Sequence, residues 1–160
     1  MMGFDWLSSF SKKVFFDIIY QYNLELYDES KSNIAFENKF IYWGMHIDDY
    51  IFIRSGFYFD KTDVNKRLDI TQLLEHEPME IKEYFYNQMQ EIFSGEYWKY
   101  QDEIIKSQIL LFHEIIKSNF LHFFEGKVPD YWEQAIKKPR YDYFKLLKDE
   151  FNGNVSKLVI

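Results

Sequence analysis

The chain has 160 residues, of which 47% are hydrophobic and 28% are charged, and its formal net charge is −7. This length and this mixture predict one folded domain spanning residues 1–160 and exclude a disordered chain. Cysteine is absent, which excludes disulfides, thiolate nucleophiles and cysteine metal ligands and is consistent with a reducing compartment.

Membranes and nucleic acids are both disfavoured as partners. The most apolar run, residues 109–112, is far shorter than the roughly 20 residues that span a membrane, and the N-terminal stretch lacks the pattern of a signal peptide. An acidic chain also lacks the excess of Lys and Arg that neutralises nucleic-acid phosphates. We therefore expect a cytoplasmic protein that binds neither membranes nor nucleic acid.

The first predicted element is an amphipathic helix that follows a serine cluster beginning at Ser8. Phe10, Val14 and Ile18 recur at the spacing of one helix face, and the serines before them are good N-caps. The pattern predicts a single N-terminal helix that ends near residues 28–32.

Residues 33–60 change to short runs of β-branched and aromatic residues separated by turn residues, which is typical of strands. We expect a small antiparallel β-meander over about residues 33–60. Asp48 and Asp49 suit a tight two-residue turn. Such a turn would place Met45 opposite Phe52 on the next strand.

The chain is helical in pattern after residue 60. Asp69 and Gln72 have the spacing of a capping box for a short helical turn. Pro78 suits the first position of a longer helix, which should stop near Gly95.

The C-terminal half is expected to hold the longest helix. Residues 96–125 are apolar over most of a helix circumference, and shorter helices are predicted near residues 130–139 and 140–151. The predicted fold is therefore α+β and predominantly helical, with an N-terminal helix and the meander followed by a bundle of four to five helices.

No catalytic or cofactor motif stands out, and the isolated glycines exclude a phosphate-binding loop. The strongest candidate is His46 with Asp48 and Asp49. On a strand, His46 and Asp48 point to the same face and could hold a divalent ion or act as an acid/base pair. Glu37 or Glu75 could complete the ligand set of a metal-dependent hydrolase, although a hairpin turn explains the two aspartates without any site. We favour the turn and expect no cofactor, metal site or catalytic residue.

Two further histidines, His113 and His122, flank the polar strip of the predicted central helix. A buried pair coupled to Glu114 or Glu125 would be a candidate acid/base site. Histidines at such a boundary usually contact solvent or backbone instead.

The net charge is concentrated between residues 69 and 103. Nine of the 26 acidic residues and two of the 19 basic residues lie there, so the rest of the chain holds 17 of each sign. Tyrosines sit among these carboxylates on the predicted wet helix face, a combination that is typical of docking surfaces for basic partners but also occurs on ordinary solvated faces. The predicted partner-binding residues are Glu80, Glu83, Tyr84, Asn87, Glu91, Glu96, Trp98, Tyr100 and Glu103.

These features favour a non-enzymatic inhibitor or immunity-type protein that blocks a basic protein partner, such as a bacterial nuclease toxin. The charge would steer association, and the aromatic residues would slow dissociation. One alternative is the metal-dependent hydrolase centred on His46. Another is a structural subunit that self-associates through the acidic stretch of residues 69–103 and a basic cluster near the C-terminus.

Overall fold

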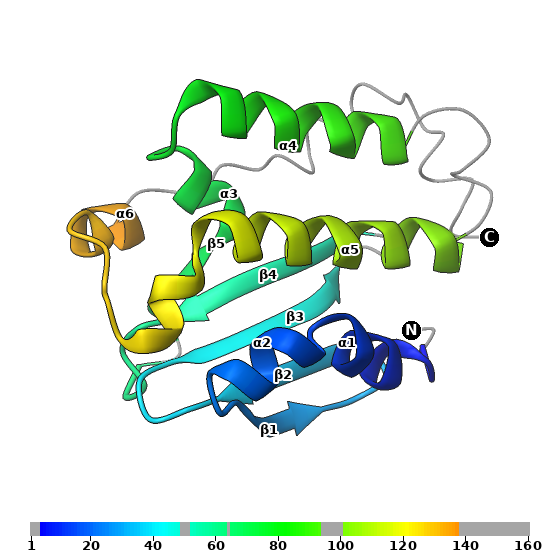
Figure 1. Ribbon diagram of the computed structural model, residues 1–160, viewed down its shortest axis with the longest axis horizontal. Helices are drawn as coiled ribbons and strands as arrows, with labels where there is room; N and C mark the ends of the chain where they lie inside the picture. Colours follow the sequence, from blue (N-terminus) through cyan, green and yellow to red (C-terminus); the bar gives the residue numbers. More distant parts are fainter. Residues whose placement is uncertain (1–3, 49–51, 64, 94–100, 138–160) are drawn as a thin grey trace.

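The computed structural model describes residues 4–48, 52–63, 65–93 and 101–137 (Figure 1). Within these ranges the central feature is a five-stranded antiparallel sheet whose strands are ordered in space as they are along the chain. The strands are β1 (Glu25–Glu29), β2 (Asn33–Glu37), β3 (Tyr42–Asp48), β4 (Phe52–Tyr58) and β5 (Arg67–Asp69).

Helices form a layer against this sheet (Figure 1). The long helix α5 (Gln101–Asn119) contacts β4, and α1 (Leu7–Val14) contacts both β2 and α5. On the other side of α5 lies α4 (Met79–Ile92). The shorter helices are α2 (Phe16–Gln21), α3 (Ile70–Leu74), the 3-10 helix η2 (Leu121–Glu125) and α6 (Trp132–Lys137).

The predicted bundle of four to five helices is wrong. Strands β2 and β3 alternate between buried and partly exposed residues, as β3 does with Trp43, Met45 and Ile47 buried, so one face of the sheet is apolar and must be covered. Because α5 is apolar around most of its surface, it packs on β4 and against α4 at once. The helices are therefore spread along the sheet and do not form a separate bundle.

The N-terminal helix is shorter than predicted and is broken in two. Phe15 separates α1 from α2 with a ψ of 13°, and α2 ends at Gln21. Asn23 then adopts a positive φ of 53°, and Leu24 N–H donates to the carbonyl of Ile19 at 3.0 Å. This is the Schellman arrangement that ends helices, so the residues predicted to continue the helix form β1 instead.

The sheet extends beyond the predicted meander of residues 33–60, because β1 precedes it and β5 follows it. All five residues of β1 are exposed, so β1 lacks the alternation that reveals a strand in a sequence. β5 has three residues, which is too short for any periodicity. Both strands exist through pairing with a neighbour.

The pairing of β3 and β4 also differs from the predicted one. Met45 pairs with Ser55, and Asp48 pairs with Phe52. The two-residue turn that begins at Asp48 and the opposition of Met45 to Phe52 are therefore wrong. The residues that connect the two strands, 49–51, lie outside the described ranges.

This register has a clear physical reason. The predicted register would set Arg54 opposite Trp43 on the core face, whereas the observed one pairs Trp43 with Phe57 and Arg54 with His46. A change of register by an odd number of residues moves a whole strand face from solvent to core. Burial of Phe57 in place of a guanidinium favours the observed pairing.

Several local predictions are confirmed. Asp69 and Gln72 form the capping box of α3, and Asp69 N–H donates to Gln72 Oε1 at 2.9 Å. Helix α4 begins directly after Pro78, and α5 with η2 falls within the predicted segment 96–125. The predicted helix over residues 140–151 lies outside the described part of the chain.

Aromatic side chains fill the space between the sheet and the helices. Trp43 is fully buried, its ring lies 4.6 Å from that of Phe15, and its Nε1 donates to Ser55 Oγ at 3.1 Å. Gln108 of α5 is also buried, and its Oε1 accepts from Ile53 N–H at 3.2 Å. The only polar side chain of α5 in this core therefore satisfies a backbone group of β4.

Candidate functional site

An open groove of about 300 Å³ runs between α4 and α5. Its apolar surface comes from Ile92, Leu110 and Leu111, and its acidic groups are Glu91 and Glu114. We call this the acidic groove. The remaining residues that line it are Gln88 and Ser107.

Tyr84 ties the two helices together beside the groove. Its side-chain hydroxyl donates to Glu114 Oε1 at 2.5 Å, while the residue as a whole is 40% exposed. The hydrogen bond to Glu114, more than burial, raises the pKa of Tyr84. An aromatic ring held in a fixed position at the surface loses little entropy when a partner covers it.

Six of the nine partner-binding residues predicted from sequence belong to α4 and α5. The described members are all exposed: Glu80, Glu83, Tyr84, Asn87, Glu91 and Glu103. Glu91 lines the acidic groove, and Tyr84 contacts Glu114, which is the second carboxylate of the groove. The remaining predicted residues, Glu96, Trp98 and Tyr100, lie outside the described residues.

Six of the seven residues that line the groove were absent from the predicted set, namely Gln88 and Ile92 on α4 and four residues on α5. Leu110, which is 52% exposed, and Glu114 face α4 across the groove with Ser107 and Leu111. The sequence carried a signal for Ser107 and Glu114, because both belong to the polar strip of the predicted central helix. It carried none for Leu110, since an exposed leucine looks like any other core position in a helical pattern.

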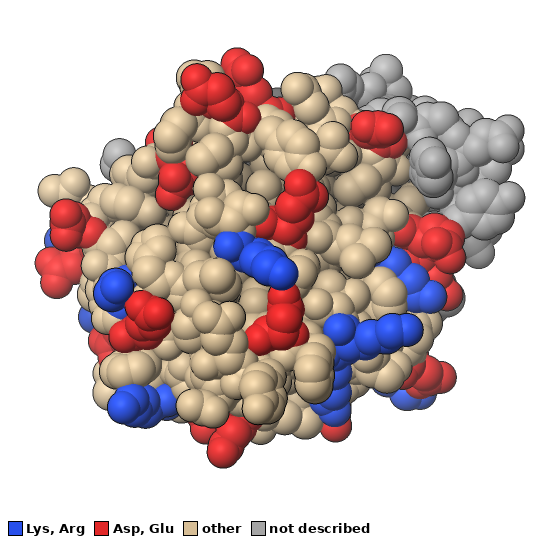
Figure 2. All heavy atoms as spheres, in the orientation of Figure 1, with Lys and Arg blue, Asp and Glu red and all other residues tan. Residues whose placement is uncertain are grey.

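The lysines of α4 and α5 contact residues away from the groove. Lys82 Nζ lies 2.9 Å from Glu75, and Lys117 Nζ lies 2.9 Å from Asp17 of α2. Lys106 Nζ lies over the ring of Trp6, 5.0 Å from its centroid. Figure 2 shows acidic side chains over α4 on this face, and side chains of both signs lower, over α5 and the N-terminal helices. Among the residues that the structure describes, the charged groups in the groove lining are therefore the carboxylates of Glu91 and Glu114.

His46 lies on the opposite face of the sheet, in a network of alternating charges. Arg54 Nε lies 2.9 Å from Asp48 Oδ2, and Arg54 Nη1 lies 3.6 Å from Asp69 Oδ2. Arg67 Nε is 2.8 Å from Asp69 Oδ1. Burial lowers the pKa of His46, and the charge of Arg67 lowers it further. His46 is therefore a neutral imidazole above its lowered pKa.

This environment does not suit the metal site considered from sequence. Arg54 is directly opposite His46 in the sheet and its Nε lies 2.9 Å from Asp48, so the carboxylate that would bind a divalent cation together with His46 is paired with a guanidinium of the protein. Glu37 lies 3.6 Å from Lys61, and Glu75 lies 2.9 Å from Lys82. Among the residues that the structure describes, no group of three side chains is arranged to hold a metal ion; Asp49 is outside them.

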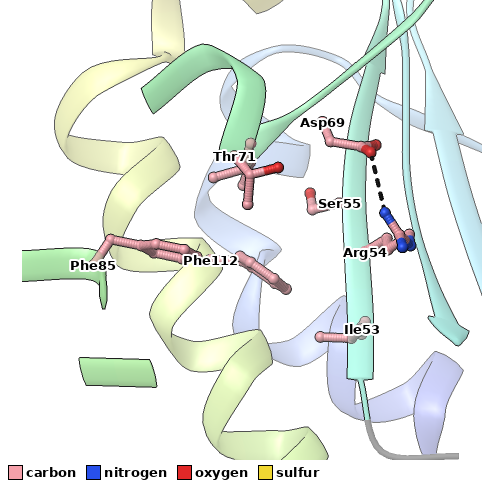
Figure 3. A pocket seen from close by; sticks show the side chains of 8 residues that line it. Ile53, Arg54, Ser55, Asp69, Thr71, Phe85 and Phe112 are labelled. Carbon is pink, nitrogen blue, oxygen red and sulfur yellow. Dashed lines mark ion pairs between the residues drawn. The ribbon is translucent and has the colours of Figure 1, made fainter. Parts of the chain in front are cut away.

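A small cavity lies where β4 extends beyond the end of β5, close to the ion pair of Arg54 and Asp69 (Figure 3). Its volume is about 10 Å³, which is close to the minimum for one water molecule. Phe85 and Phe112 close its helical side (Figure 3). The cavity is too small for a substrate and belongs to the packing between α3, α4, α5 and β4.

His113 links α5 to α2, and it does not pair with His122. His113 Nε2 lies 2.9 Å from Asp17 Oδ1, and its ring meets that of Phe15 edge-on at 5.2 Å. His122 is exposed and packs on Phe123 at 4.4 Å. The two predicted histidines therefore have separate surroundings, and His113 contributes to the packing of two helices.

Comparisons with protein-family models, with curated proteins and with solved structures found no match to this chain. In the described residues, no helix is both long enough and apolar enough to cross a membrane.

Proposed function

We propose that this protein binds a basic protein partner through the acidic groove and acts as a non-enzymatic inhibitor of immunity type. The observation that carries the proposal is the groove itself: the exposed Leu110 and the partly exposed Ile92 lie in a groove that also has Glu91 and Glu114 in its lining. A partner lysine or arginine could lay its aliphatic stem on Leu110, which is 52% exposed, while its charged head meets Glu91 or Glu114.

Electrostatics would act mainly on the rate and the choice of partner. A surface of one sign steers an oppositely charged protein toward it and disfavours acidic competitors. The affinity would come from side chains that become desolvated in the complex. Tyr84 and Leu110 are suited to this role, because both are exposed beside Glu114 on the helical layer. Tyr84 is already held in place by its hydrogen bond to Glu114.

Helix α2 offers a second set of anchors on the same layer. Phe16 and Tyr20 are 66% and 78% exposed, and their rings stack 6.2 Å apart. Asp17, between them in the chain, joins α2 to α5 through His113. A partner that covered α4, α5 and α2 could bury the roughly 800 Å² per side that stable complexes need.

The proposed setting is the cytoplasm, and the proposed partner is a bacterial toxin such as a nuclease. Nucleases carry basic surfaces because they must approach phosphates, so an acidic inhibitor complements them. The absence of cysteine agrees with a reducing compartment. The gene of such a partner is expected beside the gene of this protein.

The test is co-expression with the product of the neighbouring gene. Wild-type chain should protect the host and bind the product, and Leu110→Lys should weaken binding about tenfold or more, because a cation is placed among the carboxylates that would receive one. Val128→Lys is the matched control, since Val128 is a similarly exposed apolar residue, at 47%, and is absent from the groove lining.

Two results would contradict the proposal. One is that both lysine variants bind and protect like the wild-type chain. The other is that the neighbouring product is acidic or does not bind. Sedimentation of the chain alone, at low and high salt, would separate an inhibitor from the self-associating subunit considered from sequence, because charge-driven contacts between copies weaken with salt.

A further inference from the structure

The edge strand β1 is a second surface that is open to a partner. It lies at one end of the sheet order, and Figure 1 shows it at the opposite side of the molecule from α4. All five of its residues are exposed. In the described part of the chain, its backbone makes hydrogen bonds only with β2, so its outer row of N–H and C=O groups can accept a further strand.

One pair of charges in β1 is unfavourable within the isolated chain. Glu25 is directly opposite Glu37 of β2, on the same face of the sheet, and like charges at such positions are destabilising. Lys61 Nζ lies 3.6 Å from Glu37 Oε2 and compensates that carboxylate. Glu25 has no ion-pair partner among the described residues. A cation supplied by another molecule would relieve the repulsion.

A β-bulge brings a second acid and an aromatic ring to the same face. Tyr27 and Asp28 together oppose Ala35, and the ring of Tyr27 stacks on that of Tyr42 at 4.5 Å. Asp28 Oδ2 accepts from Asn33 at 3.0 Å and can accept further bonds, because a carboxylate has about four acceptor sites. The edge thus presents two carboxylates with an aromatic face between them.

We propose that β1 binds an extended, basic segment of a partner protein as an additional antiparallel or parallel strand. Backbone hydrogen bonds would give the pairing, and every second side chain of the segment would be Lys or Arg facing Glu25, Asp28 and the ring of Tyr27. A second copy of this chain fits poorly, because it would bring acids against acids and a bulge against a bulge.

This inference does not depend on the acidic groove, which lies at the other side of the helical layer. The probe is a capped peptide of about eight residues in which lysine and valine alternate, since alternation puts every lysine on one face of a strand. The control probe has the same sequence with an N-methyl group on every second residue, which removes the backbone donors of one edge. Binding is followed by the amide resonances of the ¹⁵N-labelled full chain.

The expected result is that the largest shifts occur at residues 25–29 and that the N-methylated probe binds about tenfold or more weakly, because it lacks the backbone bonds. The double substitution Glu25→Gln with Asp28→Asn should weaken the binding of the unmethylated probe by a similar factor. Lys31→Gln, a change at an exposed residue near the same strand, should leave the affinity for the unmethylated probe unchanged or should increase it. Circular dichroism and thermal melting confirm that the variants are folded, and the comparison of the two probes needs no variant.

Three results would overturn the inference. The first is an absence of shifts at residues 25–29, including the case in which the peptide binds only at the acidic groove, which would leave the proposed function standing. The second is equal binding of the methylated and unmethylated probes. The third is a dimer of the chain alone whose interface shifts map to β1, since a second copy would then be the occupant.

Discussion

Asp17 offers a quantitative test of how α2 is held against α5. Its Oδ1 lies 2.9 Å from His113 Nε2, and its Oδ2 lies 2.9 Å from Lys117 Nζ. Partial burial alone would raise the pKa of this carboxyl, but the hydrogen bonds from His113 and Lys117 outweigh it and lower the pKa from 3.8 to about 2. Replacement by asparagine removes the charge and keeps the shape.

The pKa shift sets an upper limit on the effect of Asp17→Asn. A shift from 3.8 to about 2 corresponds to at most about 2.5 kcal/mol, at 1.36 kcal/mol per unit. The side chain of Asp17 is 42% exposed, so solvent screens the interaction and the expected loss at neutral pH is about 1 kcal/mol. Because the folded-state pKa is the lower one, the stabilisation is fully present above pH 3.8 and disappears as the pH falls through about 2.

Urea unfolding of the wild-type chain and of Asp17→Asn, measured from pH 7 to pH 2, checks this reasoning. The difference in unfolding free energy should be present at about pH 4 and should shrink toward zero near pH 2. Lys31→Met is the control, since the pair of Lys31 and Asp5 is far more exposed and should contribute little. A difference that stays unchanged down to pH 2, or that is no larger than the control, would refute the argument.

Two further substitutions test the packing of the fold. Gln108→Leu leaves the buried N–H of Ile53 without its side-chain acceptor and should destabilise the protein by about 1–3 kcal/mol; equal denaturation midpoints for variant and wild type would show that another group takes over. Gly126 has a φ of 87°, and a Cβ there would lie 2.6 Å from Phe40 Cδ1, so Gly126→Ala should lose about 1–2 kcal/mol in chemical denaturation. Equal denaturation midpoints for Gly126→Ala and the wild type would contradict this explanation.

The charged network around His46 shows why a pattern of residue types did not identify chemistry. His46 and Asp48 do share a face of β3, as their spacing predicts. The guanidinium of Arg54 reached that face only because the register of β3 and β4 placed it there. The aspartate that could have held a cation together with His46 is thereby paired with a guanidinium of the protein itself.

Local patterns in the sequence were sufficient for the elements that depend on nearest neighbours along the chain. The capping box of Asp69 and Gln72, the start of α4 after Pro78 and the exposure of the acids on α4 all follow from spacings of three or four residues. Such features are decided within one or two helical turns, so no distant contact can easily reverse them.

The tertiary structure alone decided the strands at the ends of the sheet, the register of β3 and β4, and the layer of helices on the sheet. β1 has no buried residue and exists because β2 pairs with it. The acidic groove likewise needed α4 and α5 to lie side by side, which brought Leu110 and Glu114 opposite Glu91. Pairing and packing join residues far apart in the chain, and their free energy depends on which surfaces must be buried together.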